Sequence, residues 1–222
     1  MKNITLIIPA KKERESLPQV LDELKKYNYN IVIVLHPSDY ETIKSIENYD
    51  AQILYQKNFG YGDALISGIK NTKTEFFCIF NADGSFKPNE IEVMYKKIVE
   101  EKQDIVFGSR YLNNGKSDDD TIITLFGNYI FSNLGKLFFN LGISDILYTF
   151  VLGKTEKVNK INLESNDFCF CVELPIKAKK AGMLITEVSC HERARIAGRK
   201  KVNALKDGLL ILFKMIKLFF IK

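Results

Sequence analysis

Two oxygen-bearing side chains, Asn81 and Asp83, stand one residue apart directly after the apolar run EFFCIF. A divalent cation bound to a diphosphate needs hard oxygen ligands that are held rigidly, and the end of a buried strand supplies that rigidity. Gly84 permits the turn that brings both side chains to one place. The stretch therefore predicts a metal-diphosphate site. The alternative is a plain strand-to-loop turn, because Asn, Asp, Gly and Ser are ordinary turn formers.

A basic cluster lies late in the chain, in ERARIAGRKK. Its cationic residues are Arg193, Arg195, Arg199, Lys200 and Lys201, and Gly198 allows a turn among them. Such a loop can close over a pyrophosphate and stabilise the charge that develops on a departing nucleoside diphosphate. The alternative is a solvated basic face or a patch that contacts a membrane surface.

Three adjacent carboxylates, Asp118 to Asp120, precede an apolar helical stretch. One interpretation is a solvated loop or an amino-terminal cap for the following helix. The other is binding of an acceptor or a metal, for which Asp119 is the candidate. His36 and His191 form no convincing catalytic pair and are interpreted as packed or hydrogen-bonded loop residues. Glu173 could bond a neighbouring loop or contact a ligand, and we favour the structural bond.

The elements that must position these residues alternate between strands and helices. Apolar runs predict strands over 4–10, 30–35, 51–56, 75–80, 104–111 and 183–190, and helical periodicity predicts helices over 15–27, 62–71, 89–102 and 203–222. The stretch 121–142 is a long apolar helix or helix pair. This is an α/β pattern with a mostly parallel sheet flanked by helices, and ligands of such sheets bind beyond the carboxyl ends of the strands.

Composition favours one compact domain. The chain has 222 residues, 46% of them hydrophobic and 27% charged, which excludes a disordered chain. The formal net charge of +5 suits a phosphate-rich ligand or an anionic membrane, and no nucleic-acid-binding motif is present. Cys78, Cys169, Cys171 and Cys190 lack metal-site spacing, so we expect reduced core thiols in a cytoplasmic protein. Cys169 and Cys171 alternate with phenylalanines as a strand would.

Five motifs, LIIPAKKERESLPQVLDEL, NFGYGDALISGI, FNADGSFKP, FGSRY and the late VELPIKAKKAG…ERARIAGRKKVNALKDGL, together resemble inverting family-two glycosyltransferases of the GT-A fold. The similarity is greatest to the branch that acts on dolichyl and undecaprenyl phosphates, and it covers nearly the whole chain. It implies a Rossmann-like nucleotide-diphospho-sugar transferase fold over residues 1–222. Residues 1–112 would be the nucleotide-sugar-binding half, 113–202 the acceptor half and 203–222 a carboxyl-terminal amphipathic helix.

The resemblance also implies roles for individual residues. NADG stands where the family holds Mg2+ or Mn2+ with an Asp-x-Asp motif, so Asp83 would be the principal metal ligand and Asn81 a neutral oxygen donor. The nucleotide-sugar pocket would be formed by Pro9, Ala10, Glu13, Asp39, Gly60, Gly62, Asp63, Asn81, Ala82 and Asp83. Acceptor and phosphate contacts would come from Arg110, Asp119, Asp145, Arg193 and Arg199. Catalysis would involve Asp83, Arg110, Arg195 and Lys201. A structural ion pair is the alternative for Arg110.

The sequence departs from the family pattern at several positions. Asn81 replaces the usual first aspartate, which removes a negative charge and should weaken cation binding. VLHPSDY lacks two consecutive aspartates that contact the nucleoside in relatives, and only Asp39 partly stands in. Lys11 and Lys12 occupy the place of a frequent Tyr-Asn pair. ILYTF follows Asp145 where relatives often carry Pro-x-Ser-Gly-Phe, so the acceptor site differs from the usual one.

We therefore expect an enzyme that transfers a sugar from a nucleoside diphosphate sugar to a polyprenyl phosphate, with inversion. Transfer to a hydroxyl would need a general base, whereas a phosphate oxygen is already anionic. A sugar nucleotidyltransferase is one alternative, although PAKKERES is not its usual Gly-rich loop, and a catalytically silent nucleotide-sugar-binding module is another.

We expect the terminal helix to bind the cytoplasmic surface of a membrane. It is too short and too interrupted by Lys214 and Lys217 to cross a bilayer, which requires about 20 apolar residues. Together with the apolar stretch YIFSNLGKLFFNLG, it can lie on a bilayer surface beside a lipid acceptor, with its lysines reaching lipid headgroups. The competing expectation is that the apolar helices pack against the domain or a second subunit.

Overall fold

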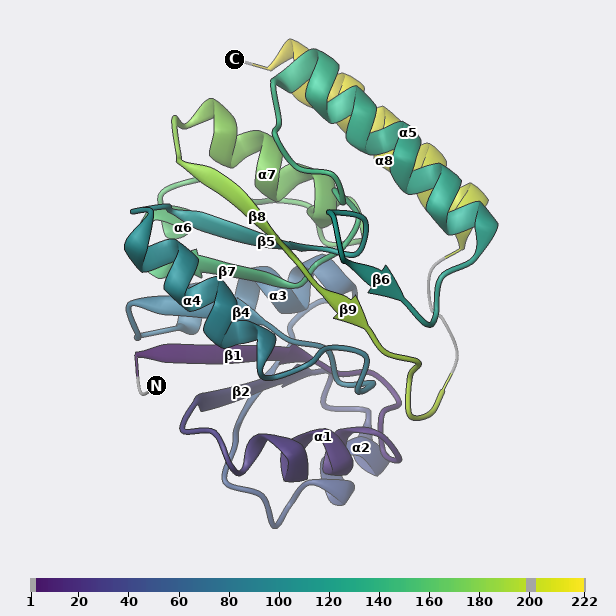
Figure 1. Cartoon of the computed structure of the whole chain (residues 1–222). Coiled ribbons are helices and arrows are strands. Elements are labelled where there is room, and N and C mark those ends of the chain that lie inside the picture. Colours follow the sequence, from purple (N-terminus) through teal and green to yellow (C-terminus); the bar gives the residue numbers. More distant parts are fainter. Residues whose placement is uncertain (1–2, 199–202, 222) are drawn as a thin grey trace.

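A seven-stranded sheet forms the centre of the computed structural model, which describes residues 3–198 and 203–221 (Figure 1). The strand order is β3-β2-β1-β4-β7-β5-β8. The strands are β1 (Ile4–Pro9), β2 (Asn30–Leu35), β3 (Gln52–Tyr55), β4 (Phe76–Ile79), β5 (Ile105–Ser109), β7 (Val151–Lys154) and β8 (Ile185–Ser189). Strands from residues 1–112 and from 113–202 thus share one sheet. All neighbouring strands are parallel except β7, which is antiparallel to β4 and β5.

Helices cover both faces of this sheet (Figure 1). They are α1 (Leu17–Leu24), α2 (Tyr40–Ser45), α3 (Tyr61–Asn71), α4 (Glu90–Glu100), α5 (Ile122–Phe139), α6 (Thr155–Asn159), α7 (Phe170–Lys180) and α8 (Ala204–Phe220). Successive strand residues face opposite sides, so Leu6 and Ile8 pack with α1 and α4 while Ile7 packs with α3. The predicted α/β class with a mostly parallel sheet is confirmed.

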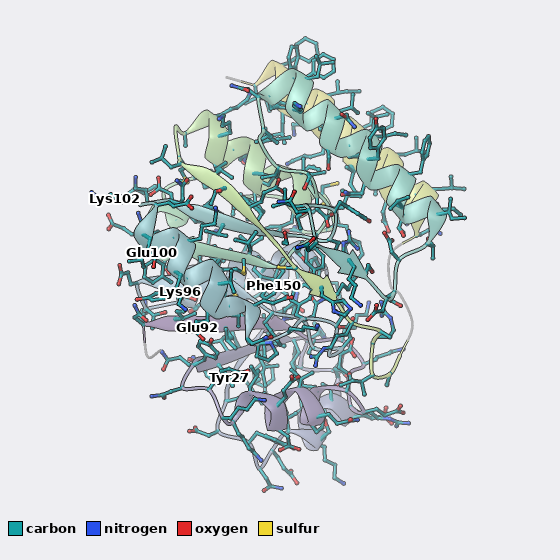
Figure 2. The ribbon with its side chains drawn as sticks, viewed as in Figure 1. Tyr27, Glu92, Lys96, Glu100, Lys102 and Phe150 are labelled. Atoms are coloured by element: carbon teal, nitrogen blue, oxygen red, sulfur yellow. The ribbon has the colours of Figure 1, made fainter. Side chains whose placement is uncertain are left out.

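The helix α4 shows how its sequence divides between core and solvent. Ile91, Met94 and Ile98 recur at helical spacing and are buried. Glu92, Lys96 and Glu100 lie on the exposed side of this helix (Figure 2).

The strand β7 was not predicted from the sequence. It is short and has no exposed face, because β4 and β5 flank it and helices cover it. A short fully buried strand carries no alternating pattern that would mark it. Two further short strands, β6 (Lys116–Ser117) and β9 (His191–Glu192), pair in parallel outside the main sheet.

The strand-like alternation around Cys169 and Cys171 was interpreted wrongly. Cys169 is the residue before α7, and Cys171 lies inside that helix. The helix is buried on most of its surface, so its apolar residues show no single-face periodicity, and a four-residue alternation is too short to distinguish a strand. The prediction of reduced core thiols is confirmed for the packing, since all four cysteines are free and buried.

The helices α5 and α8 lie side by side at one end of the molecule (Figure 1). The ring of Phe219 contacts those of Phe138 and Phe139, with centroids 5.6 and 6.1 Å apart. The inner face of α8, with Ile211 and Met215, packs into the core beside α7. Among the described residues, α5 alone is long and apolar enough to cross a membrane, as judged by length and composition.

Candidate active site

The predicted site residues lie on loops that follow the carboxyl ends of several parallel strands. The NADG turn follows β4, and Arg110 follows β5. The basic segment, which is the described part of the basic cluster, residues 193–198, follows β8 and β9. Because parallel strands end at the same edge of a sheet, these loops come together at that edge. The antiparallel β7 begins there, which brings Tyr148 and Thr149 to the same edge.

The NADG turn is fixed by short-range hydrogen bonds. Asp83 Oδ1 accepts the backbone N–H of Ser85 at 3.0 Å, and Gly84 adopts φ of +82°, which favours glycine. Asn81 Nδ2 donates to Ser85 Oγ at 3.1 Å. The amide nitrogen of Asn81 is thereby used within the turn, which leaves its oxygen as the donor that a cation would use.

The basic segment lies directly over this turn. The backbone N–H of Arg193 donates to the Ser85 carbonyl and that of Ile196 to the Asp83 carbonyl, both at 2.8 Å. A Cβ added at Gly84 would stand 2.4 Å from Ile196 Cδ1, so the glycine also makes room for the segment. Sequence reasoning did not single out Ser85 or Ile196. These contacts join two segments that lie far apart in the sequence, so no local residue pattern indicates them.

Arg195 connects two acidic residues within this arrangement. Its Nη2 donates to Asp119 Oδ2 at 2.8 Å, and its Nη1 lies 3.6 Å from Asp83 Oδ2. Burial alone would lower the pKa of Arg195, but the hydrogen bond to Asp119 and the charge of Asp83 raise it above its ordinary value. The structure therefore brings together Asp83, Asp119 and Arg195. Arg199 and Lys201, with Lys200, lie outside the described residues.

Arg193 makes contacts within the protein. Its guanidinium donates to both carboxylate oxygens of Glu23 on α1, at 3.1 and 2.9 Å, and to the Phe86 carbonyl at 2.7 Å. These bonds tie the basic segment to the first helix. A phosphate contact by Arg193 remains a prediction and would require these bonds to rearrange.

Arg110 and Asp145 form an ion pair. Arg110 Nε and Nη2 donate to the two carboxylate oxygens of Asp145 at 2.8 and 2.9 Å, and Nη1 donates to Glu192 at 3.1 Å. Burial acts to lower the pKa of Arg110, but Asp145 raises it well above its usual value. The Asp145 side chain has no exposed surface. Of the two interpretations left open for Arg110, the structure shows the ion pair, and this geometry gives Asp145 no direct access to an acceptor.

Each carboxylate of the acidic run has a partner. Asp118 Oδ2 lies 2.6 Å from His191 Nε2, and this hydrogen bond lowers the pKa of Asp118. Asp120 accepts the backbone N–H of Thr121 at 2.9 Å, and Thr121 is the amino-terminal cap of α5. The other nitrogen of His191 lies 2.6 Å from Lys87 Nζ. The predicted hydrogen bonding of His191 is confirmed, although the residue lies in β9 and not in a loop. Lys87 is a neighbour that the sequence did not indicate.

The loop after β1 forms one wall of a cavity of about 290 Å³. Its lining includes Lys12, Glu13, Glu41 and Gly198, so the end of the described basic segment faces this loop. The backbone N–H of Lys12 donates to Asp39 Oδ2 at 2.6 Å, which joins the loops after β1 and β2. Glu13 is mostly buried and accepts a bond from Ser16 Oγ at 2.7 Å. Pro9 and Ala10, which complete the predicted wall, lie at the carboxyl end of β1.

Gly60 and Gly62 allow a second loop to pack against the start of α3. A Cβ at Gly60 would stand 2.0 Å from the Asn166 carbonyl oxygen, and one at Gly62 would stand 2.0 Å from that of Ser165. Asp63 is buried there and accepts a bond from Asn58 Nδ2 at 3.1 Å. The observed partners of both glycines are thus backbone atoms of residues 165–167, and a nucleotide contact of these glycines stays a prediction.

Glu173 on α7 holds this second loop in place. Its Oε2 accepts the backbone N–H groups of Ser165 and Glu164 at 2.7 and 3.0 Å, and its Oε1 lies 2.8 and 2.9 Å from the Nζ atoms of Lys177 and Lys214. Burial would raise the pKa of Glu173, but these partners lower it to about 2. The favoured structural role of Glu173 is confirmed.

The oxygen donors at the NADG turn fit a divalent cation that is bound together with a diphosphate. They consist of one carboxylate, from Asp83, and one amide oxygen, from Asn81. Within residues 3–198 and 203–221 no group of three or more His, Cys, Asp or Glu side chains could enclose a metal ion. Mg2+ is commonly held by one or two carboxylates with substrate phosphates and water completing its shell. This donor set meets that requirement.

Comparisons with known proteins find a family model and relatives that match most of this chain. The model of Glycosyl transferase family 2 matches residues 5–161. An uncharacterized protein of Methanocaldococcus jannaschii is 26% identical over 220 residues, with 96% of this chain and 90% of that protein covered. An uncharacterized glycosyltransferase of Mycobacterium tuberculosis is 24% identical over 208 residues, with 94% and 93% covered.

Solved structures of glucosyl-3-phosphoglycerate synthase from Mycobacterium tuberculosis have the same fold. The complex with Mn2+, uridine diphosphate and glucosyl-3-phosphoglycerate has a TM-score of 0.78 at 15% identity and covers 100% of this chain and 81% of that one. The complex with Mg2+ and uridine diphosphate has a TM-score of 0.74 at 12% identity, with 100% and 80% covered. This likeness confirms the predicted GT-A fold. The dolichyl and undecaprenyl phosphate branch stays a prediction.

Proposed function

Because the chain belongs to glycosyl transferase family 2, we propose that it transfers a sugar from a nucleoside diphosphate sugar to a polyprenyl phosphate, with inversion. The proposed binding of the sugar donor rests on one observation. The basic segment is hydrogen-bonded across the NADG turn and places Arg195 between Asp83 and Asp119. Acid and base chemistry by a side chain is not needed with a phosphate acceptor, since its oxygen is already anionic.

Asp83 and Asn81 would hold Mg2+ or Mn2+ against the donor diphosphate. When bound, the cation neutralises negative charge on the diphosphate as it leaves. Arg195 supplies a second positive charge beside the leaving diphosphate. Because negative charge develops on the diphosphate in the transition state, Arg195 stabilises the transition state more than the ground state. The pairing of Arg110 with Asp145 and Glu192 keeps the loop after β5 in position for this chemistry.

The acceptor proposal rests on the exposed apolar helices that begin beside the site. Only Asp120 and Thr121 separate Asp119 from the start of α5. Phe126 on α5 is 62% exposed and Phe213 on α8 is 65% exposed, which are unusual values for phenylalanine. A membrane would cover these side chains and present a lipid-borne phosphate to the nearby loops. The corresponding location is the cytoplasmic face of a membrane.

A soluble phosphate acceptor is the second candidate. A neighbouring structure of glucosyl-3-phosphoglycerate synthase contains phosphoglyceric acid, another phosphate-bearing molecule. This candidate shares the donor chemistry with the first and differs in needing no membrane. The two are separable by experiment.

The deciding assay offers the purified protein UDP-glucose or GDP-mannose with Mn2+, and with a short-chain polyprenyl phosphate, phosphoglyceric acid or no acceptor. Mass spectrometry would detect the products. We expect a glycosylated polyprenyl phosphate. Sugar on phosphoglyceric acid alone would support the soluble acceptor. Conversion of the nucleotide sugar and added pyrophosphate into a nucleoside triphosphate and a sugar 1-phosphate would indicate a nucleotidyltransferase, and binding without turnover would indicate a silent module.

A further inference from the structure

Asp83 already has a cation beside it. Its Oδ2 lies 3.6 Å from Arg195 Nη1, while its Oδ1 accepts the backbone N–H of Ser85. Both oxygens of the carboxylate are therefore engaged by groups of the protein. Arg195 is itself held by Asp119, whose Oδ2 takes Nη2 at 2.8 Å.

The guanidinium of Arg195 opposes the binding of a bare metal ion to Asp83. Arg195 offsets the negative charge of Asp83 in part, because it also pairs with Asp119, and Asn81 contributes an oxygen without a charge. A divalent cation approaching Asp83 would meet the guanidinium at close range, where repulsion between like charges is strong in a partly buried setting. A diphosphate changes this balance, because it offers Arg195 an anionic partner and gives the cation further oxygen ligands.

We propose that Arg195, positioned by Asp119, is the resident counter-ion of Asp83 and keeps a bare divalent cation off this carboxylate until a diphosphate binds. The inference rests on the proposed function, since the diphosphate is that of the donor. On donor binding, Asp83 exchanges Arg195 for the cation, and Arg195 turns to the diphosphate. Arg195 thus guards the metal site in the donor-free state and contacts the leaving group in the loaded state.

The surrounding structure allows this exchange through the side chain alone. The backbone on both sides of Arg195 is fixed, because Arg193 and Ile196 donate to the carbonyls of Ser85 and Asp83. The 3.6 Å contact with Asp83 is looser than the 2.8 Å bond to Asp119. Rotation about the outer bonds of Arg195 therefore breaks the weaker contact while Asp119 still limits where the guanidinium can go.

The test compares binding of Mn2+ alone with binding of Mn2+ in the presence of UDP or GDP, by calorimetry and by the electron paramagnetic resonance signal of free Mn2+. We expect Arg195→Gln to bind Mn2+ alone about tenfold more tightly than the wild type, because a positive charge near Asp83 is gone. The same variant should bind the nucleoside diphosphate with Mn2+ about tenfold more weakly. These opposite changes would not arise from a merely structural arginine.

Lys96→Gln serves as the control, since it removes one positive charge from the exposed side of α4, and Arg195→Lys should restore wild-type behaviour in part. In an Asp119→Asn background the effect of Arg195→Gln on Mn2+ alone should shrink, and an undiminished effect would remove the positioning role of Asp119. Unchanged or weaker binding of Mn2+ alone by Arg195→Gln would overturn the counter-ion proposal. Failure of the wild type to bind UDP or GDP with Mn2+ would instead count against the proposed function.

Discussion

At the scale of single residues, Asp83 is the one carboxylate of the NADG turn, because Asn81 offers only an uncharged amide oxygen. We predict that Asp83→Ala abolishes Mn2+-dependent binding of UDP or GDP. We predict that Asn81→Asp preserves or strengthens it, because this change adds a hard anionic ligand. Titration calorimetry with the nucleoside diphosphate and Mn2+ measures both.

Asp83→Asn is the matched control for the shape of the turn. An amide oxygen at position 83 can still accept the N–H of Ser85, so this variant keeps the turn while it removes the charge. It should lose Mn2+-dependent binding nearly as fully as the alanine variant. Affinity equal to the wild type in both variants would rule Asp83 out as a metal ligand.

The sequence predicted part of this site because strand ends could be located in it. Asp83 and Arg195 both follow strands whose carboxyl ends share one sheet edge, which is enough to expect them close together. The partner of Arg110 could not be predicted in the same way. Asp145 lies 35 residues further along, and only the folded loop shows that it uses both of its oxygens on this arginine.

At the scale of elements, α7 and α8 are joined to the loop over α3 by one buried carboxylate, that of Glu173. Lys214 was expected from the sequence to reach lipid headgroups. Its Nζ instead lies 2.9 Å from this carboxylate, and its side chain is 14% exposed. That expectation was wrong for Lys214. Its position on the inner face of α8 points it to Glu173.

We predict that Glu173 makes the protein sensitive to acid. Its folded-state pKa of about 2 lies below its ordinary value of 4.5, so its stabilising contribution is complete above pH 4.5 and is lost as the pH falls from 4.5 towards 2. The difference corresponds to about 3 kcal/mol in the free energy of unfolding. Glu173→Gln should lower that free energy by a similar amount at neutral pH. Urea unfolding at pH 7 and pH 3 would measure both effects.

The control is Glu156→Gln, which removes an exposed glutamate from a surface pair with Lys160 on α6. Exposed pairs contribute little, so its unfolding curve should match the wild type at both pH values. If Glu173→Gln retained wild-type stability at neutral pH, the carboxylate would not be the tie between these elements.

The elements were largely predictable where the apolar residues form a continuous run or recur with helical spacing. The parallel strands and α1, α3 and α4 follow from apolar runs and helical spacing. Two of the failures, β7 and the start of α7, share a physical cause. Both are buried on nearly all sides, so neither has a polar face whose spacing would reveal its conformation.

At the scale of the whole molecule, α5 and α8 divide between core and exposed surface. Ile211, Met215 and Leu218 of α8 belong to the core, so deleting the end of the chain would uncover the domain interior. The outer side is apolar and exposed at positions Ile122, Ile123, Leu125, Phe126, Tyr129, Ile130, Leu137 and Phe138 of α5, and Leu205, Leu209, Leu210, Phe213, Ile216, Phe219 and Phe220 of α8. Lys136, Lys206 and Lys217 are exposed on the same helices. A membrane test must therefore change only outward-facing side chains.

We predict that replacing Phe126, Leu209 and Phe213 together by serine abolishes sedimentation with anionic vesicles and leaves Mn2+-dependent nucleotide binding unchanged. Burial in a bilayer interface yields about 25 cal/mol per square ångström of apolar area, and each lysine near anionic lipid adds roughly 1 kcal/mol, so losing three large side chains removes much of the attraction. Val93→Ser with Val99→Ser, at similarly exposed positions on α4, should still sediment. Light scattering measures the oligomeric state and so tests the competing expectation of a second subunit. If the wild type is a dimer that does not bind vesicles, and the triple variant is a monomer, then a second subunit and not a membrane covers these helices.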